Sequence, residues 1–211
     1  MSWASRSADN ILPCSNEKNV LAAALKEWLY TGDMLDLEEP IENCQLCDHP
    51  DVRYQFCIKN KFNGNELLVG SECINKFEIK AIDSDGTILG LDDSRKKINS
   101  DRRYLVEEAR KKRVINSLVQ LSRAESDFDI ESFITYLQDR GSFTPNQLCT
   151  IFWRFKEYNI EHKKTDYKFT IRRNREKAQI REMPDWKLKI LWDSMSTAQK
   201  TWVKENTNYS D

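Results

Sequence analysis

Three cysteines and a histidine between residues 44 and 80 have the types and spacing of a metal site. Cys44 and Cys47 form a Cys-x-x-Cys pair, His49 follows two residues later, and Cys73 comes further along the chain. A Cys-x-x-Cys turn directs two thiolates at one point, and Zn²⁺ takes four such ligands in a tetrahedron. We therefore expect one structural zinc ion in a small module between residues 44 and 80.

The fourth zinc ligand has two candidates. His49 would complete a Cys₃His site, which is a common ligand set. Cys57 would complete a Cys₄ site, but the alternation of residues 52–58 places it in mid-strand on the polar face. We favour His49, so the predicted metal ligands are Cys44, Cys47, His49 and Cys73, with Cys57 as the alternative.

A hairpin and a short helix are needed to bring Cys73 back to the first cysteine pair. Residues 52–58 alternate between apolar and polar types, as in a strand, and Asn63-Gly64-Asn65 is a turn signal before a returning strand at 66–69. Residues 71–79 predict a helix with its first serine as the cap. Cys73 would lie in the first turn, where the helix dipole favours a thiolate. A treble clef has this order of elements: a Cys-x-x-Cys turn, then a hairpin, then a helix that carries a ligand.

Two other readings of these cysteines are weaker. The pair could have arisen by chance, with the thiols buried as small apolar groups, but the hairpin and the placement of Cys73 argue jointly against this. A redox Cys-x-x-Cys of the thioredoxin type follows a strand and opens a helix, a context that is absent at Cys44. One feature departs from a typical treble clef: Gly70 and Lys76 stand where a second helix ligand would be.

The stretch from about residue 41 to residue 80 resembles treble-clef or zinc-ribbon modules of poorly characterised bacterial and phage proteins. The likeness rests on Cys-x-x-Cys-x-His, "YQFCIKN", "FNGN" and "LLVGSECINKF", and more weakly on "FTPNQLCTIFWRF" and "RRNREKAQIREM" later in the chain. It implies a role in nucleic-acid metabolism or phage–host interaction, without a settled activity. It gives no support to Cys57 as a ligand, because an apolar residue is expected there.

Most of the remaining chain predicts helices. Few Gly and Pro residues and 32% charged residues favour a mostly helical protein, and 39% hydrophobic residues suffice for a core. We therefore predict a mostly α fold with a small zinc-binding β-hairpin, and three parts: an N-terminal helix with an acidic link (1–40), the zinc module (41–91) and a helical domain (92–211). The expected helices lie at about 16–30, 101–123, 130–139, 144–158, 172–182, 184–194 and 197–205.

Charge and hydropathy limit the cellular environment and the kinds of partner that we expect. No segment reaches the roughly 20 apolar residues of a membrane span, and residues 1–10 lack a signal-peptide core, so we expect a cytoplasmic protein and no membrane partner. The net charge is −1, but residues 1–43 carry three basic and eight acidic residues. Residues 163–189 carry ten basic and four acidic residues, which would attract nucleic acid.

The later basic stretch is a candidate nucleic-acid surface. Basic residues neutralise phosphates, and the interleaved Tyr167 and Phe169 could stack on bases. An ordinary charged helix face, with Glu176 and Glu182 as partners, is the competing explanation. An ordinary charged face is the preferred explanation for the basic residues of helix 101–123. The tryptophans of the later helices are expected in the core, and they are Trp153, Trp186, Trp192 and Trp202. The candidate nucleic-acid-binding residues are Lys163, Lys164, Lys168, Arg172, Arg173, Arg175 and Lys177.

The sequence predicts a protein without catalytic activity. Glu72 is the one obvious acid beside a predicted ligand, but in a first helical turn its charge simply stabilises the helix. The hairpin lacks the histidine base of a ββα-metal nuclease, and no phosphate loop or nucleophile motif occurs. We predict a zinc-stabilised nucleic-acid-binding accessory protein of bacterial or phage type, with DNA and RNA both open as partners. The alternative is a protein-interaction factor that regulates a host or phage enzyme.

Overall fold

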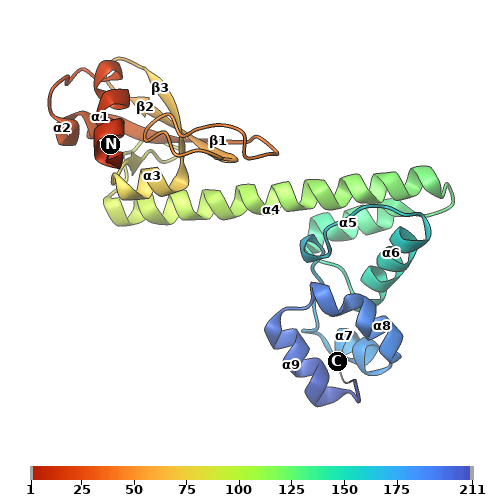
Figure 1. Cartoon of the computed structure of the whole chain (residues 1–211). Coiled ribbons are helices and arrows are strands. Elements are labelled where there is room, and N and C mark those ends of the chain that lie inside the picture. The colour runs from red at the N-terminus through yellow and green to blue at the C-terminus, as the bar shows by residue number, and fades with distance from the viewer. Residues whose placement is uncertain (1, 210–211) are drawn as a thin grey trace. The chain divides into compact units, whose positions relative to one another are not determined.

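The computed structural model describes residues 2–209 of the 211-residue chain (Figure 1). The chain divides into two compact units, a first unit of residues 1–109 and a second unit of residues 110–211. The division falls inside helix α4 (Leu91–Ala124), and each unit has its own buried core.

The first unit contains a four-stranded sheet with the strand order β3-β2-β1-β4. The predicted hairpin is confirmed, because β2 (Tyr54–Asn60) and β3 (Glu66–Gly70) pair antiparallel, with Phe56 opposite Val69. The centre of the sheet was not predicted: β1 (Trp28–Asp36) pairs antiparallel with β2 and parallel with β4 (Lys80–Ala81).

The predicted helix at 16–30 is wrong. Only α2 (Leu21–Leu25) is helical there, and Trp28 already opens β1. The Glu27 carboxylate accepts the backbone N–H groups of Asn16 and Glu17, at 2.7 and 2.8 Å, and holds that segment as a loop. Trp28 and Tyr30 are buried in the sheet core, so tertiary packing overrides the local helical pattern.

The predicted division into 1–40, 41–91 and 92–211 differs from the two units. Strand β1 comes from the predicted N-terminal part, yet it occupies the middle of the sheet that carries the cysteines. The first part of α4 also packs on this unit, with Ile98 buried in its core. Long-range pairing, which a local pattern does not report, decides both assignments.

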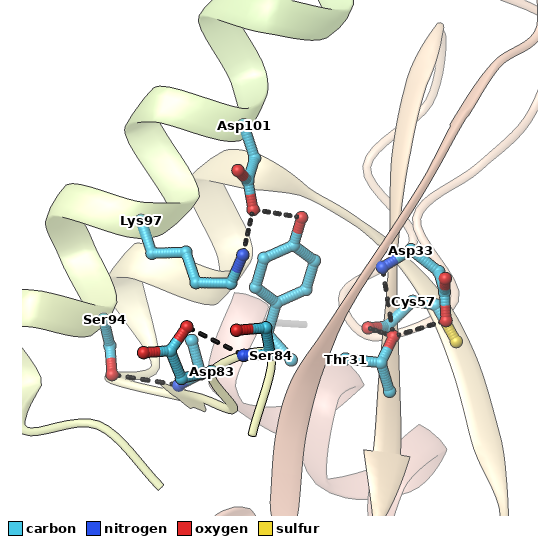
Figure 2. A network of polar contacts seen from close by, with 10 residues as sticks. Thr31, Asp33, Cys57, Asp83, Ser84, Ser94, Lys97 and Asp101 are labelled. Atoms are coloured by element: carbon cyan, nitrogen blue, oxygen red, sulfur yellow. Dashed lines mark hydrogen bonds and ion pairs between the residues drawn. The ribbon is translucent and has the colours of Figure 1, made fainter. Parts of the chain in front are cut away.

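A polar network fastens α4 to the sheet of the first unit (Figure 2). The Tyr30 hydroxyl donates to Asp101 Oδ2 at 3.0 Å, and Lys97 donates to the same oxygen at 3.0 Å. Ser94 Oγ accepts the backbone N–H of Ala81 at 2.9 Å. The helix therefore begins at Leu91, ten residues before the predicted start at 101, because its first turns are held by these contacts.

The second unit is helical. The cap signals predicted there are confirmed: Thr144 and Gln147 form a capping box, and Gly141 ends α5 in the left-handed region at φ 66°. Its core includes Leu118, Phe143 and Phe155. The helices are α5 (Ile130–Arg140), α6 (Pro145–Glu157), α7 (Asn174–Arg181), α8 (Asp185–Leu191) and α9 (Thr197–Asn206), with 3₁₀ turns η2 (Lys164–Asp166) and η3 (Trp192–Ser194).

The chain is thus mostly helical with one small four-stranded sheet. A short N-terminal helix, α1 (Trp3–Ile11), and the 3₁₀ turn η1 (Leu12–Cys14) precede the sheet and were not predicted. Within residues 2–209, no helix combines the length and the apolar composition that crossing a membrane requires.

Candidate metal centre

Three cysteines of the first unit come together as a single cluster. Cys44 and Cys47 lie in the turn before β2, and Cys73 lies in α3 (Ser71–Lys76), the short helix that follows β3. The Sγ atoms lie within 4.8 Å of one another, with 3.5 Å between Cys44 and Cys73 and 2.9 Å between Cys47 and Cys73. All three side chains are buried, so the cluster is shielded from bulk water.

Backbone hydrogen bonds shape the turn that carries the first two cysteines. The Cys44 N–H donates to the His49 carbonyl, and the Asp48 N–H donates to the Cys44 carbonyl, both at 2.9 Å. Asp48 has a φ of 57°, which lets the chain reverse tightly. Gln45 links the turn to β3, because it exchanges two hydrogen bonds with the backbone of Leu68.

The helix that supplies Cys73 begins slightly differently from the prediction. Gly70 is its N-cap and Ser71 its first residue, and the helix ends at Lys76 where residue 79 was expected. Cys73 nevertheless lies in the first turn, as predicted. The Gly70 N–H lies 3.4 Å from Cys44 Sγ and donates to it, so the start of the helix supports the cluster through the backbone as well.

The electrostatics favour a thiolate at Cys44. Contact with the Cys73 thiol, which outweighs the opposing effect of burial, lowers the pKa of Cys44 to about 5. The N–H groups of Gly70, Leu46 and Cys47 act in the same direction. The same contact, together with burial, raises the pKa of the Cys73 thiol, so of these two thiols only Cys44 is favoured as a thiolate. Because a metal takes cysteine in the deprotonated form, Cys73 would lose its proton on metal binding.

The spacing and chemistry of the three sulfurs fit a soft metal ion. A tetrahedral site with Zn–S bonds of about 2.3 Å places its sulfurs roughly 3.8 Å apart. The 3.5 Å between Cys44 and Cys73 is close to this spacing, and the 2.9 Å between Cys47 and Cys73 is shorter, so a bound ion would move these two sulfurs apart. Thiolates select zinc, copper(I) or iron–sulfur clusters over magnesium or calcium. The cluster can therefore hold a metal ion, with three ligands from the chain in place.

The two candidates for the fourth ligand lie in different places. His49 lines a cavity of about 440 Å³ together with Cys44, Cys47 and Cys73, although its own side chain is exposed. Cys57 lies in β2 next to Thr31 and Asp33, where its carbonyl accepts the Thr31 hydroxyl (Figure 2). Cys57 does not belong to the thiol cluster found among residues 2–209.

Helix α1 covers the cysteine turn, a contact that sequence reasoning missed. Asn10 Nδ2 donates to the Asp48 carboxylate at 2.9 Å and to the Leu46 carbonyl at 3.3 Å. Trp3 packs edge-on against Phe77, with ring centroids 4.9 Å apart. Two signals could have revealed this helix: Ser2 caps it through the Ser5 N–H, and Trp3, Ser7 and Ile11 repeat at a spacing of four.

Glu72 also lines the cavity beside the thiols. Its side chain is 83% exposed and forms an ion pair with Arg102 at 3.1 Å. Arg102 thus reaches the residues around the cysteine cluster from α4, a contact that the sequence did not predict.

The predicted nucleic-acid-binding residues lie apart from the cysteines, in the second unit. Arg172, Arg173 and Arg175 are exposed around the start of α7. Lys163 and Lys168 are exposed as well, whereas Lys177 is half-buried and Lys164 pairs with Asp193 at 2.9 Å. The buried Glu176 carboxylate accepts the backbone N–H groups of Arg172 and Arg173, so it holds the helix start in place.

The tryptophans of the second unit depart from the prediction. Trp192 is buried and Trp202 half-buried, as expected for core residues. Trp153 and Trp186 are 47% and 55% exposed, so their assignment to the core is wrong. Leu148, Phe152 and Phe155 fill the inner face of α6, which leaves Trp153 on its rim.

Comparison of this chain with protein-family models, with curated proteins and with solved structures found no match.

Proposed function

We propose that this protein is a zinc-stabilised, non-catalytic accessory protein that binds nucleic acid through its second unit. Charge supports this assignment: residues 110–211 contain 20 basic and 14 acidic residues, a net charge of +6, and residues 1–109 contain 13 and 20, a net charge of −7. A polyanion would be attracted to the second unit and repelled by the first.

The observation that carries the proposal is the cluster of exposed arginines at the start of α7. Arg172, Arg173 and Arg175 lie within four residues, at a helix end where the dipole already favours anions. Positive side chains are unfavourable for the helix itself at that end, so their presence points to a ligand of opposite charge. A phosphate backbone is such a ligand.

The zinc site serves as a structural element in this proposal. Cys44, Cys47 and Cys73 would join the turn before β2 to α3, with His49 as the fourth ligand in a treble-clef-like arrangement. Four protein ligands leave no open position for a water molecule, which is why we assign no catalysis to the metal. The resemblance to bacterial and phage modules agrees with such a role.

The lysines of the zinc module are poor candidates for phosphate contacts. Lys59 forms an ion pair with Glu66 at 2.7 Å, and Lys76 lies over the Trp3 ring at 3.6 Å from its centroid. These contacts and the negative net charge of the first unit favour the second unit as the site of the proposed interface.

Binding to labelled DNA and RNA at several salt concentrations tests the proposal. Affinity should fall steeply as salt rises, because phosphate contacts release counterions. Absence of binding to both nucleic acids in single- and double-stranded form at low salt would remove this function. The alternative, a protein-interaction factor, would then be the better assignment, and capture of a partner from the native host would identify it. The cytoplasmic location and the choice between DNA and RNA stay predictions.

A further inference from the structure

Two exposed tryptophans line the same groove of the second unit. Trp153 on α6 is 47% exposed and Trp186 on α8 is 55% exposed. The groove has a volume of about 930 Å³, and Phe152, Phe155 and Ile190 contribute to its lining. We call this cavity the tryptophan groove.

Half-exposed tryptophans in one groove call for a binding partner. Tryptophan presents a large apolar ring, and such rings are concentrated at binding surfaces. Each ring also has a cation next to it: Arg154 lies over Trp153 at 4.9 Å from the ring centroid, and Lys187 lies over Trp186 at 5.4 Å. Aromatic surface and positive charge therefore occur together at both positions.

The charge around the groove is complementary to a polyanion. Residues 153–164 and 185–191, which supply most of the lining, contain six basic and three acidic residues. Lys156 lines the groove and is exposed, so it can approach a phosphate group. A purely apolar peptide would gain nothing from this excess of cations, whereas a nucleic-acid strand would.

His162 adds an unsatisfied acceptor to the lining. Its Nδ1 donates to the Ile160 carbonyl at 2.9 Å, which leaves Nε2 as an acceptor in the neutral ring. That atom is buried without a hydrogen-bond partner among the described residues. Buried polar atoms normally have a partner, and the amino group of a nucleobase inserted into the groove would be a suitable donor once the lining opens around Nε2.

We infer that the tryptophan groove stacks unpaired bases, so that the protein binds single-stranded nucleic acid in preference to duplex. The inference rests on the proposed nucleic-acid-binding function and specifies its ligand. Bases in a duplex are stacked on one another and are not available to Trp153 and Trp186, whereas every unpaired base has a free face. The arginines of α7 would contact phosphates in either form.

The test compares a labelled 20-nucleotide single strand with the corresponding duplex, using the full-length protein. Replacement of both tryptophans (W153A/W186A) should weaken single-strand binding about 10-fold or more and leave duplex binding within about twofold. The conservative variant W153F/W186F should retain most of the affinity, because phenylalanine can still stack. Y104A is the matched control, since Tyr104 is 63% exposed on α4 and lies outside the groove.

The outcomes separate the inference from the proposed function. Wild-type protein that binds duplex and single strand equally, with no effect of W153A/W186A, would overturn the inference and leave nucleic-acid binding intact. A protein partner that requires both tryptophans, with unchanged single-strand binding in the same variant, would also overturn it. Both substitutions are on the surface, so an unchanged circular dichroism spectrum and melting temperature should accompany the loss of binding.

Discussion

Cys44 and Cys73 are 29 residues apart in the chain, yet their Sγ atoms lie 3.5 Å apart. The β2–β3 hairpin between them returns the chain to the first cysteine pair. Gly70, the last residue of β3, both caps α3 and donates its N–H to Cys44. The hairpin and the helix start therefore build the cluster together, and a metal ion bound there would connect the turn before β2 to α3.

Purified protein should contain about one zinc ion per chain, because the cluster supplies ligands for a single tetrahedral site. Cys44→Ser or Cys73→Ser should lose the metal and unfold at least residues 44–80, since binding of structural zinc contributes on the order of 10 kcal/mol to folding. Elemental analysis and hydrogen exchange measure the two effects. Cys14→Ser is the control, because Cys14 lies outside the cluster. A metal-free protein, or one that contains iron, would contradict the zinc assignment.

His49→Ala should weaken zinc binding, and Cys57→Ala should not, because His49 lines the cavity of the three thiols and Cys57 lies beside Thr31. Competition with a chromogenic chelator gives the zinc affinity of each variant. Release of zinc from the Cys57 variant alone would show that the preference for His49 is mistaken.

Reversing the charge of Arg172, Arg173 and Arg175 together should weaken binding to DNA or RNA regardless of sequence, because phosphate contacts position a protein without specifying bases. The slope of log affinity against log salt should become shallower by up to about one unit per lost contact. Fluorescence anisotropy at several salt concentrations measures both quantities.

The matched control reverses three exposed lysines of the first unit, Lys26, Lys61 and Lys80, and so changes the net charge equally. That variant should keep most of the affinity and the wild-type slope. Equal losses in the two triple variants would mean that net charge governs binding, without a defined surface at α7.

Asp166→Asn should destabilise the second unit by about 1–3 kcal/mol at pH 7. Burial by itself would raise the pKa of Asp166, but the bidentate Arg113 guanidinium, at 2.7 and 3.0 Å, holds it below its usual value. A lowered folded-state pKa means that the stabilisation is complete above the unfolded-state value of about 3.9 and is lost as the pH falls through the folded-state value.

Hydrogen exchange in the second unit, measured from pH 7 to pH 3, should therefore show a difference between wild type and Asp166→Asn that shrinks below about pH 4. Exchange reports the second unit separately from the first unit, where the proposed metal would bind. A difference that stays constant down to pH 3 would show that the charge of Asp166 contributes no stability.

Local signals in the sequence determined several parts of this protein. The Cys-x-x-Cys spacing with Cys73 predicted which three thiols meet, because a turn, a hairpin and a helix start are short-range structures. The Thr144–Gln147 box and Gly141 predicted helix ends for the same reason, since caps act through hydrogen bonds within a few residues. The mostly helical composition was likewise readable from the scarcity of Gly and Pro.

Only the tertiary structure decided the remainder. Residues 28–30 read as the end of a helix and the residues after them as a link, but pairing with β2 and β4 makes residues 28–36 an inner strand of the sheet. Trp153 read as a core residue, but Phe152 and Phe155 occupy the buried face of α6 and leave Trp153 on a groove. In both cases the local pattern permits two arrangements, and contacts with residues far away in the chain select one of them, because burial and strand pairing depend on neighbours in space.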